Sequence, residues 1–140
     1  MIDRADAPAA GRAPLTILVA DDSRVMRAMI IRTLRLTGLS LGAVHEAADG
    51  AAGLDILRSH PIALALVDIN MPRLSGLDML AQLGRPGDAG PRVIVVSSDG
   101  SDARAAQVME MGHGFLHKPF APEDLRDAVL RVLGAPTDDR

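Results

Sequence analysis

Apolar runs of strand length alternate along the chain with segments in which apolar residues recur every three or four positions. The longest run, from Ile62 to Val67, has no polar interruption and stops at Asp68. Continuous apolar runs of this length predict strands that are buried on both faces, as in a parallel α/β sheet. Pro72 ends this segment, because proline has no backbone N–H to donate to a neighbouring strand.

Four further segments predict strands, of which the second and the last are short and include polar residues. They cover residues 15–20, 43–47, 93–96 and 115–117. Between them, apolar positions three and four apart predict helices, because such positions share one helix face, and the methionines at this spacing are expected in the core. The expected helical segments are about 23–38, 49–60, 77–83, 101–111 and 122–133. Five strands alternating with five helices predict a doubly wound parallel sheet with right-handed crossovers.

The predicted sheet belongs to a single domain, residues 15–134, since a chain of 140 residues can bury a sizeable core. Residues 1–14 are rich in alanine, proline and small polar groups and are expected to form a flexible leader, and residues 135–140 a polar tail. If the chain reverses direction after the first strand–helix–strand unit, the strand order is 2-1-3-4-5. The reversal then falls between the first and third strands.

Composition excludes several classes of function. The chain has no cysteine, so it has neither disulfides nor thiolate metal sites and suits a reducing cytosol. Its apolar runs are too short to span a bilayer, and its N-terminus lacks the apolar segment of a secretion signal. A net charge of −3 and the absence of tyrosine and tryptophan argue against direct nucleic-acid binding. We therefore expect a cytoplasmic protein that does not insert into membranes.

Polar side chains stand where four of the predicted strands end. They are Asp21 and Asp22 after the first strand, Asp68 after the third, Ser97 after the fourth and Lys118 after the fifth. The carboxyl ends of parallel strands share one edge of the sheet, which is where α/β proteins bind ligands. Lys118 is also the single lysine among 15 basic residues, so the one compact ammonium group is expected at this edge.

The chemistry of these side chains favours phosphoryl transfer. Carboxylates gathered at one edge raise one another's pKa unless a cation joins them. Oxygen donors without sulfur or imidazole favour Mg²⁺ over zinc or copper. A carboxylate beside Mg²⁺, with an ammonium and a hydroxyl group nearby, can accept a phosphoryl group as an aspartyl phosphate. The end of the central strand makes Asp68 the best placed nucleophile.

Taken together, the motifs of this chain resemble the receiver domain of two-component response regulators. The matching segments are Asp21-Asp22-Ser23 with Arg27, Asp68-Ile69-Asn70-Met71-Pro72 with Gly76, Ser97-Ser98, and Phe115 ahead of Lys118-Pro119-Phe120. Each motif alone is weak, but four of them in this order at the ends of alternating strands are specific. The resemblance covers about residues 14–134 and implies a flavodoxin-like (βα)5 fold.

For the phosphoryl site, the resemblance implies a role for each matching residue. Asp68 would be the phosphoacceptor, and Lys118 would contact the phosphoryl group. Asp21, Asp22 and Asp68 would bind Mg²⁺. The backbone carbonyl of Asn70 would be a further ligand.

The resemblance also implies a conformational switch. Ser97 would be the switch hydroxyl, followed by a small residue, Ser98, and Phe115 would be the aromatic switch residue without the hydroxyl of the frequent tyrosine. Lys118 precedes Pro119, where the family often has a cis peptide bond. We further hypothesise that Asn70 and Asp99 flank the hydrolytic water and set the lifetime of the phosphorylated state.

The function implied is that of a signalling switch. A sensor histidine kinase or a histidine phosphotransfer protein would supply the phosphoryl group, and the domain would catalyse only its own phosphorylation and dephosphorylation. The fourth helix, fifth strand and fifth helix would then form the face that binds a downstream protein. Since the sequence ends soon after the last helix, output is expected by docking, as in chemotaxis-type or phosphorelay single-domain regulators. The alternative that this sequence is a receiver domain cut from a longer regulator stays open.

Two other classes of protein use similar features. Phosphatases and phosphotransferases of the haloacid-dehalogenase type use a strand-end aspartate with Mg²⁺, but they need a second acid two residues later, where this chain has Asn70. A flavin or dinucleotide domain is a third option, but the turn Ala20-Asp21-Asp22-Ser23 has no glycine-rich phosphate loop. The histidines are expected at the surface or in turns, and His113 is expected in a loop without a role.

Overall fold

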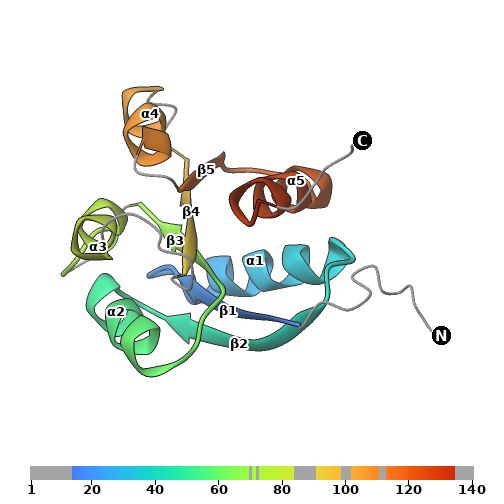
Figure 1. The fold of residues 1–140 in the computed structure, drawn as a ribbon, viewed down its shortest axis with the longest axis horizontal. Coiled ribbons are helices and arrows are strands. Elements are labelled where there is room, and N and C mark those ends of the chain that lie inside the picture. The colour runs from blue at the N-terminus through green and yellow to red at the C-terminus, as the bar shows by residue number, and fades with distance from the viewer. Residues whose placement is uncertain are drawn as a thin grey trace.

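Five parallel strands form the centre of the fold, coloured from blue to red along the chain in Figure 1. They are β1 (Leu15–Ala20), β2 (Leu41–Ala47), β3 (Leu64–Asp68), β4 (Arg92–Ser97) and β5 (Gly114–His117). The order is β2-β1-β3-β4-β5, and every neighbouring pair is parallel, which confirms the doubly wound fold. The computed structural model describes residues 14–69, 71, 73–83, 91–98, 102–110 and 113–134.

Helices cover both faces of this sheet (Figure 1). One face carries α1 (Arg24–Leu36) and α5 (Pro122–Val132); the other carries α2 (Gly50–Ser59), α3 (Gly76–Leu83) and α4 (Asp102–Glu110). Successive side chains of a strand point to opposite faces, so each central strand contributes to two cores. Leu64 and Leu66 of β3 pack on the α1 and α5 side, whereas Ala65 and Val67 pack on the other side.

The helices that follow β1 and β2 begin directly after the polar turns at the carboxyl edge. Ser23 caps α1, and its hydroxyl accepts a hydrogen bond from the Met26 N–H at 3.1 Å. Asp49 caps α2 in the same way, with Oδ1 2.8 Å from the Ala52 nitrogen. Such caps satisfy backbone N–H groups that the first turn of a helix leaves unpaired. They fix the two turns next to the predicted site.

Some strands begin at other residues than expected, because pairing with the neighbouring strand sets where a strand begins. β2 begins at Leu41, before the expected Ala43, because Leu41 pairs with Leu15 across an irregular step in the register. β3 begins at Leu64 and includes Asp68, although Ile62 before it is also buried. An apolar run therefore marks burial, while the strand itself is set by its neighbours.

The methionines divide between core and surface, so their expected place in the core is only partly correct. Met79 of α3 is 1% exposed, but Met29 of α1 is 56% exposed. The buried stripe of α1 is narrow and consists of Ile30 and Leu34, so Met29 lies beside it. No helix in the described part of the chain is both long enough and apolar enough to cross a bilayer.

Candidate functional site

Three carboxylates meet at the carboxyl edge of the sheet. Asp21, Asp22 and Asp68 each offer an oxygen, and these oxygens lie within 4.8 Å of one another. Asp21 follows β1 and Asp68 ends β3, and the two strands are neighbours in the sheet. Asp21 is 1% exposed and Asp68 is 9% exposed, while Asp22 faces solvent. The strand order thus gathers acids that are far apart in the sequence, as the strand-end argument predicts.

Lys118 bridges two of these carboxylates. Its Nζ lies 3.3 Å from Asp21 Oδ2 and 3.3 Å from Asp68 Oδ1, and its side chain is 16% exposed. The Lys118 N–H donates to the Ser97 carbonyl oxygen at 2.8 Å, which ties the end of β5 to the end of β4. The peptide bond to Pro119 is cis. The single lysine of the chain therefore lies within the acidic cluster.

The environment of Asp68 disfavours its charge. Burial raises the pKa of Asp68; the Lys118 ammonium opposes this shift, and the carboxylates of Asp21 and Asp22 raise the pKa further. A divalent cation at the cluster would remove the repulsion among these acids. The cluster contains only carboxylate donors, with no imidazole or thiolate among them, so it fits a hard ion such as Mg²⁺.

The acidic turn after β1 is held by an arginine of α1. Arg27 donates from Nη1 to the Asp21 carbonyl oxygen at 2.6 Å and from Nε to Glu46 Oε1 at 2.9 Å. The Ser23 N–H donates to Asp21 Oδ1 at 2.8 Å. Arg27 belongs to the motif noted in the sequence, but nothing in the sequence identifies Glu46 as its partner.

The segment after Asp68 is packed tightly against β3 and α2. A Cβ on Gly76 would lie 2.7 Å from the Asp68 carbonyl oxygen, and one on Gly50 would collide with the Leu74 carbonyl. Arg73, with a left-handed φ of 70°, places Nη2 3.0 Å from Asp49 Oδ2. The Ala52 N–H and the Arg73 guanidinium lower the pKa of Asp49 below its ordinary value, although burial opposes this shift.

The predicted switch residues lie on the two strands beside this cluster. Ser97, at the end of β4, is fully buried. Phe115 of β5 is partly buried against the core on the α2, α3 and α4 side. The centroids of its ring and the His117 ring lie 5.0 Å apart in a T-shaped arrangement. Asn70 and Asp99, the residues predicted to tune the phosphoryl lifetime, lie outside the described residues.

A groove of about 370 Å³ runs beside the cluster. Its lining residues are Met26, Met29, Ile30 and Thr33 of α1 together with Ser98, Lys118, Pro119 and Phe120. Most of these side chains are apolar, so the groove joins an apolar wall of α1 to the ammonium of Lys118. Helical spacing alone does not predict the groove, because it depends on where the segment after β5 passes α1.

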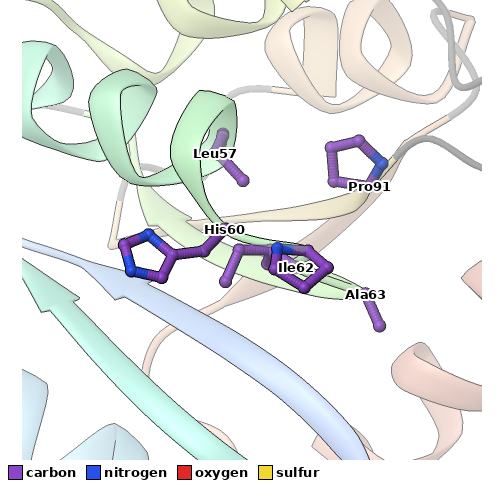
Figure 2. A pocket seen from close by; sticks show the side chains of 6 residues that line it. Leu57, His60, Ile62, Ala63 and Pro91 are labelled. Carbon is purple, nitrogen blue, oxygen red and sulfur yellow. The ribbon is translucent and has the colours of Figure 1, made fainter.

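A second cavity, of about 320 Å³, lies at the opposite edge of the sheet, where β3 and β4 begin (Figure 2). It is lined mainly by Leu57, Ile62 and Pro91, beside His60. The His60 ring contacts the His45 ring of β2 with centroids 4.6 Å apart. None of the predicted site residues that the structure describes lines this cavity, so it is separate from the acidic cluster.

His113 lies in a loop, as expected, but its side chain is buried. It directly precedes β5 and is 5% exposed, and its N–H donates to the Val108 carbonyl oxygen at 3.3 Å. His117 is exposed, as expected. The candidate metal-binding group in the described part of the chain consists of Asp21, Asp22 and Asp68 and includes neither of these histidines.

The fold and this edge define a class of protein. The chain belongs to the response regulator receiver domain family, whose model matches residues 17–130. This membership identifies it as a receiver domain of two-component signalling and agrees with the resemblance drawn from the motifs. It leaves no support for the phosphatase and nucleotide-domain alternatives.

Individual relatives agree with this assignment. The chain is 35% identical to response regulator MprA of Mycolicibacterium vanbaalenii over 90% of its own length and 53% of that protein. It is 39% identical to response regulator MprA of Mycobacterium bovis over 84% of its length and 49% of the relative. The chain therefore spans about half the length of the curated relatives that it matches.

Solved structures show the same fold. Chemotaxis response regulator CheY4 of Vibrio cholerae superposes with a TM-score of 0.70 at 27% identity, covering 86% of this chain and 99% of that one. The receiver domain of the putative response regulator NarL from Mycobacterium tuberculosis gives a TM-score of 0.73 at 30% identity, covering 86% and 98% of the two chains. The flavodoxin-like, CheY-like arrangement predicted from the sequence is confirmed.

Proposed function

We propose that Asp68 accepts a phosphoryl group from the phosphohistidine of a partner, either a sensor histidine kinase or a histidine phosphotransfer protein. The observation that carries this proposal is the position of Lys118, whose Nζ lies 3.3 Å from carboxylate oxygens of both Asp21 and Asp68. A cation there can hold an incoming phosphoryl oxygen beside the attacking carboxylate. The domain would catalyse its own phosphorylation and dephosphorylation and act on no other substrate.

In the proposed step, a carboxylate oxygen of Asp68 attacks phosphorus. The bond between phosphorus and the donor's imidazole nitrogen breaks, and its electron pair stays on that nitrogen. The Lys118 ammonium donates a hydrogen bond to one phosphoryl oxygen, and the Ser97 hydroxyl donates to another. Mg²⁺, held by Asp21, Asp22, Asp68 and the Asn70 carbonyl, would neutralise charge on the phosphoryl oxygens. In the reverse reaction water attacks phosphorus, which releases phosphate and restores the Asp68 carboxylate.

Phosphorylation would shift a pre-existing equilibrium between two conformations of the domain. Ser97 and Phe115 lie on β4 and β5, so a change at the cluster can reach the face formed by α4, β5 and α5, where we propose that the target protein binds. The groove beside Lys118 supports access of the donor from the α1 side.

We propose residues 15–134 as the receiver domain, with 1–14 as a leader and 135–140 as a tail. It acts alone or as part of a longer regulator.

Intact-protein mass spectrometry after incubation with acetyl phosphate tests the phosphoacceptor assignment. We expect one phosphoryl adduct that requires Mg²⁺ and is absent in Asp68→Asn. Asp55→Asn changes an exposed aspartate of α2 in the same way and should be labelled like the wild type. No adduct under any condition, or an adduct that survives in Asp68→Asn, would overturn the assignment.

The phosphoryl lifetime gives a second test of the same site. We propose that Asn70 and Asp99 flank the water that hydrolyses the aspartyl phosphate. Exchanging both residues should then change the dephosphorylation rate by much more than about twofold, which corresponds to roughly 0.4 kcal/mol on the barrier. Loss of the adduct followed over time measures this rate, and a smaller change would rule out the assignment of these two residues.

A further inference from the structure

Arg27 is a largely buried arginine whose two bonded partners differ in kind. Its side chain is 14% exposed, whereas that of Glu46 is 48% exposed. One nitrogen of the guanidinium reaches the backbone carbonyl of Asp21, and the other reaches the Glu46 carboxylate. Two nitrogens of the planar guanidinium reach these partners in fixed directions, whereas a lysine would have to reach both from a single nitrogen on a flexible stem. Arg27 therefore links α1, the acidic turn and β2.

Each polar atom of Asp21 has its own hydrogen-bond partner. Its N–H donates to the Ala47 carbonyl of β2 at 3.0 Å, and its carbonyl accepts from Arg27 at 2.6 Å. Its carboxylate accepts from the Ser23 N–H at 2.8 Å and from Lys118 at 3.3 Å. Two of these partners are side chains. Lys118 contacts carboxylates of the cluster, whereas the described contact of Arg27 is with the backbone of Asp21.

We propose that Arg27, held in place by Glu46, is a positioning residue that fixes Asp21 for metal binding and phosphoryl transfer. This inference rests on the proposed function, because it assumes that Asp21 is a ligand of Mg²⁺. The Asp21 carbonyl marks the point where the chain leaves β1 and enters the turn. Without the Arg27 contact, the turn loses one of its two restraints from the start of α1, and the carboxylates of Asp21 and Asp22 are held less firmly.

A positioning role and a simple charge effect of Arg27 predict opposite changes in Mg²⁺ affinity when Arg27 is removed. Arg27 is a cation that contacts the backbone of a cluster residue, so if only its charge mattered, its removal would strengthen Mg²⁺ binding. If Arg27 positions Asp21, its removal weakens Mg²⁺ binding instead, because outer residues that orient metal ligands contribute about tenfold or more to affinity. The direction of the change therefore decides between the two explanations.

The first experiment measures Mg²⁺ affinity by isothermal titration calorimetry for the wild type, Arg27→Met and Arg27→Lys. We expect Arg27→Met to weaken binding by about tenfold or more. Arg27→Lys keeps the charge but has no second fixed donor, so it should fall between Arg27→Met and the wild type. Arg24→Met removes an exposed charge from the same end of α1 and should bind Mg²⁺ like the wild type.

A double-mutant cycle with Glu46→Met tests whether the two residues act as a unit. Glu46→Met alone should weaken Mg²⁺ binding, and it should have little further effect in the Arg27→Met background. A glutamate that acts only through its charge would weaken binding equally in both backgrounds. Hydrogen exchange of the Asp21 N–H in the Mg²⁺-free variants gives a readout that does not depend on the metal, and it should quicken in Arg27→Met.

The outcomes separate this inference from the proposed function. A wild type that neither binds Mg²⁺ nor forms an aspartyl phosphate overturns the proposed function itself. A wild type that does both, with Arg27→Met binding Mg²⁺ equally well or more tightly, overturns only the positioning role. A urea titration of each variant shows whether it is folded, and Arg27→Lys supplies the comparison if Arg27→Met is not.

Discussion

Asp68 is a carboxyl group that folding removes almost completely from water. It is 9% exposed, and the Lys118 ammonium lies 3.3 Å from its Oδ1. Burial still outweighs this attraction, so the pKa of Asp68 lies above its ordinary value of 3.8. The ionised Asp68 carboxylate therefore destabilises the metal-free fold.

Replacing Asp68 with asparagine should stabilise the metal-free protein, and the gain should depend on pH. Because the folded pKa is raised, the folded state binds the proton more tightly than the unfolded state. The free energy of unfolding of the wild type therefore falls as the pH rises from the unfolded value through the folded pKa. The melting temperature of Asp68→Asn should exceed that of the wild type near neutral pH, and this difference should shrink in acid.

Thermal melts by circular dichroism in a chelating buffer, from about pH 4 to about pH 8, measure this difference. Asp55→Asn is the matched control, because Asp55 is an exposed aspartate on α2. A difference between Asp68→Asn and the wild type that stays constant over this range would contradict the assignment of a raised pKa to Asp68.

At the scale of helices and strands, the parts predicted correctly from the sequence are those with a local pattern. The continuous apolar runs before Asp21 and Asp68 mark central strands, and parallel strands necessarily place their polar ends on one edge. Exposure of Met29 was not predictable, because it depends on how α1 lies against the sheet. The pairs Arg27–Glu46 and Arg73–Asp49 join distant segments and leave no spacing pattern in the sequence.

Gly76 illustrates how an element boundary supports the site. It is the first residue of α3, and a Cβ there would lie 2.7 Å from the Asp68 carbonyl oxygen and 3.1 Å from the Ile69 Cα. Both neighbours are backbone atoms, which cannot move aside cheaply. Gly53 of α2 is the contrasting case, because its added Cβ would meet the flexible end of Met79 at 3.0 Å.

Gly76→Ala should therefore displace the backbone of Asp68, lowering both the stability of the fold and the rate of phosphorylation. Gly53→Ala should disturb the site much less. Alanine is more favourable than glycine inside a helix by about 1 kcal/mol, and the Met79 side chain can move aside. Urea titration and the rate of adduct formation with acetyl phosphate measure the two effects. Equal phosphorylation rates for Gly76→Ala and the wild type would show that the Asp68 backbone tolerates the added methyl group.

At the scale of the whole molecule, the acidic edge concentrates charge where three strands of the sheet end. Asp21 and Asp68 follow the neighbouring strands β1 and β3, and Lys118 reaches them from β5, past the end of β4. Repulsion among the carboxylates thus acts on the centre of the sheet and opposes folding of the entire domain. A ligand that relieves this repulsion must stabilise the whole fold, because it binds only when all these strand ends are assembled.

Mg²⁺ should therefore raise the melting temperature of the wild type, and the increase should grow with the logarithm of its concentration once the site is saturated. A concentration about 100 times the dissociation constant stabilises a folded protein by about 2.7 kcal/mol. Asp22→Asn is the informative variant, because Asp22 is exposed and belongs to the carboxylate group but makes no described contact with Lys118. It should fold normally and lose most of the response, while sodium chloride at matched ionic strength should not reproduce it. An unchanged wild-type melt across millimolar Mg²⁺, or an equal rise in Asp22→Asn, would mean that these carboxylates do not form the metal site.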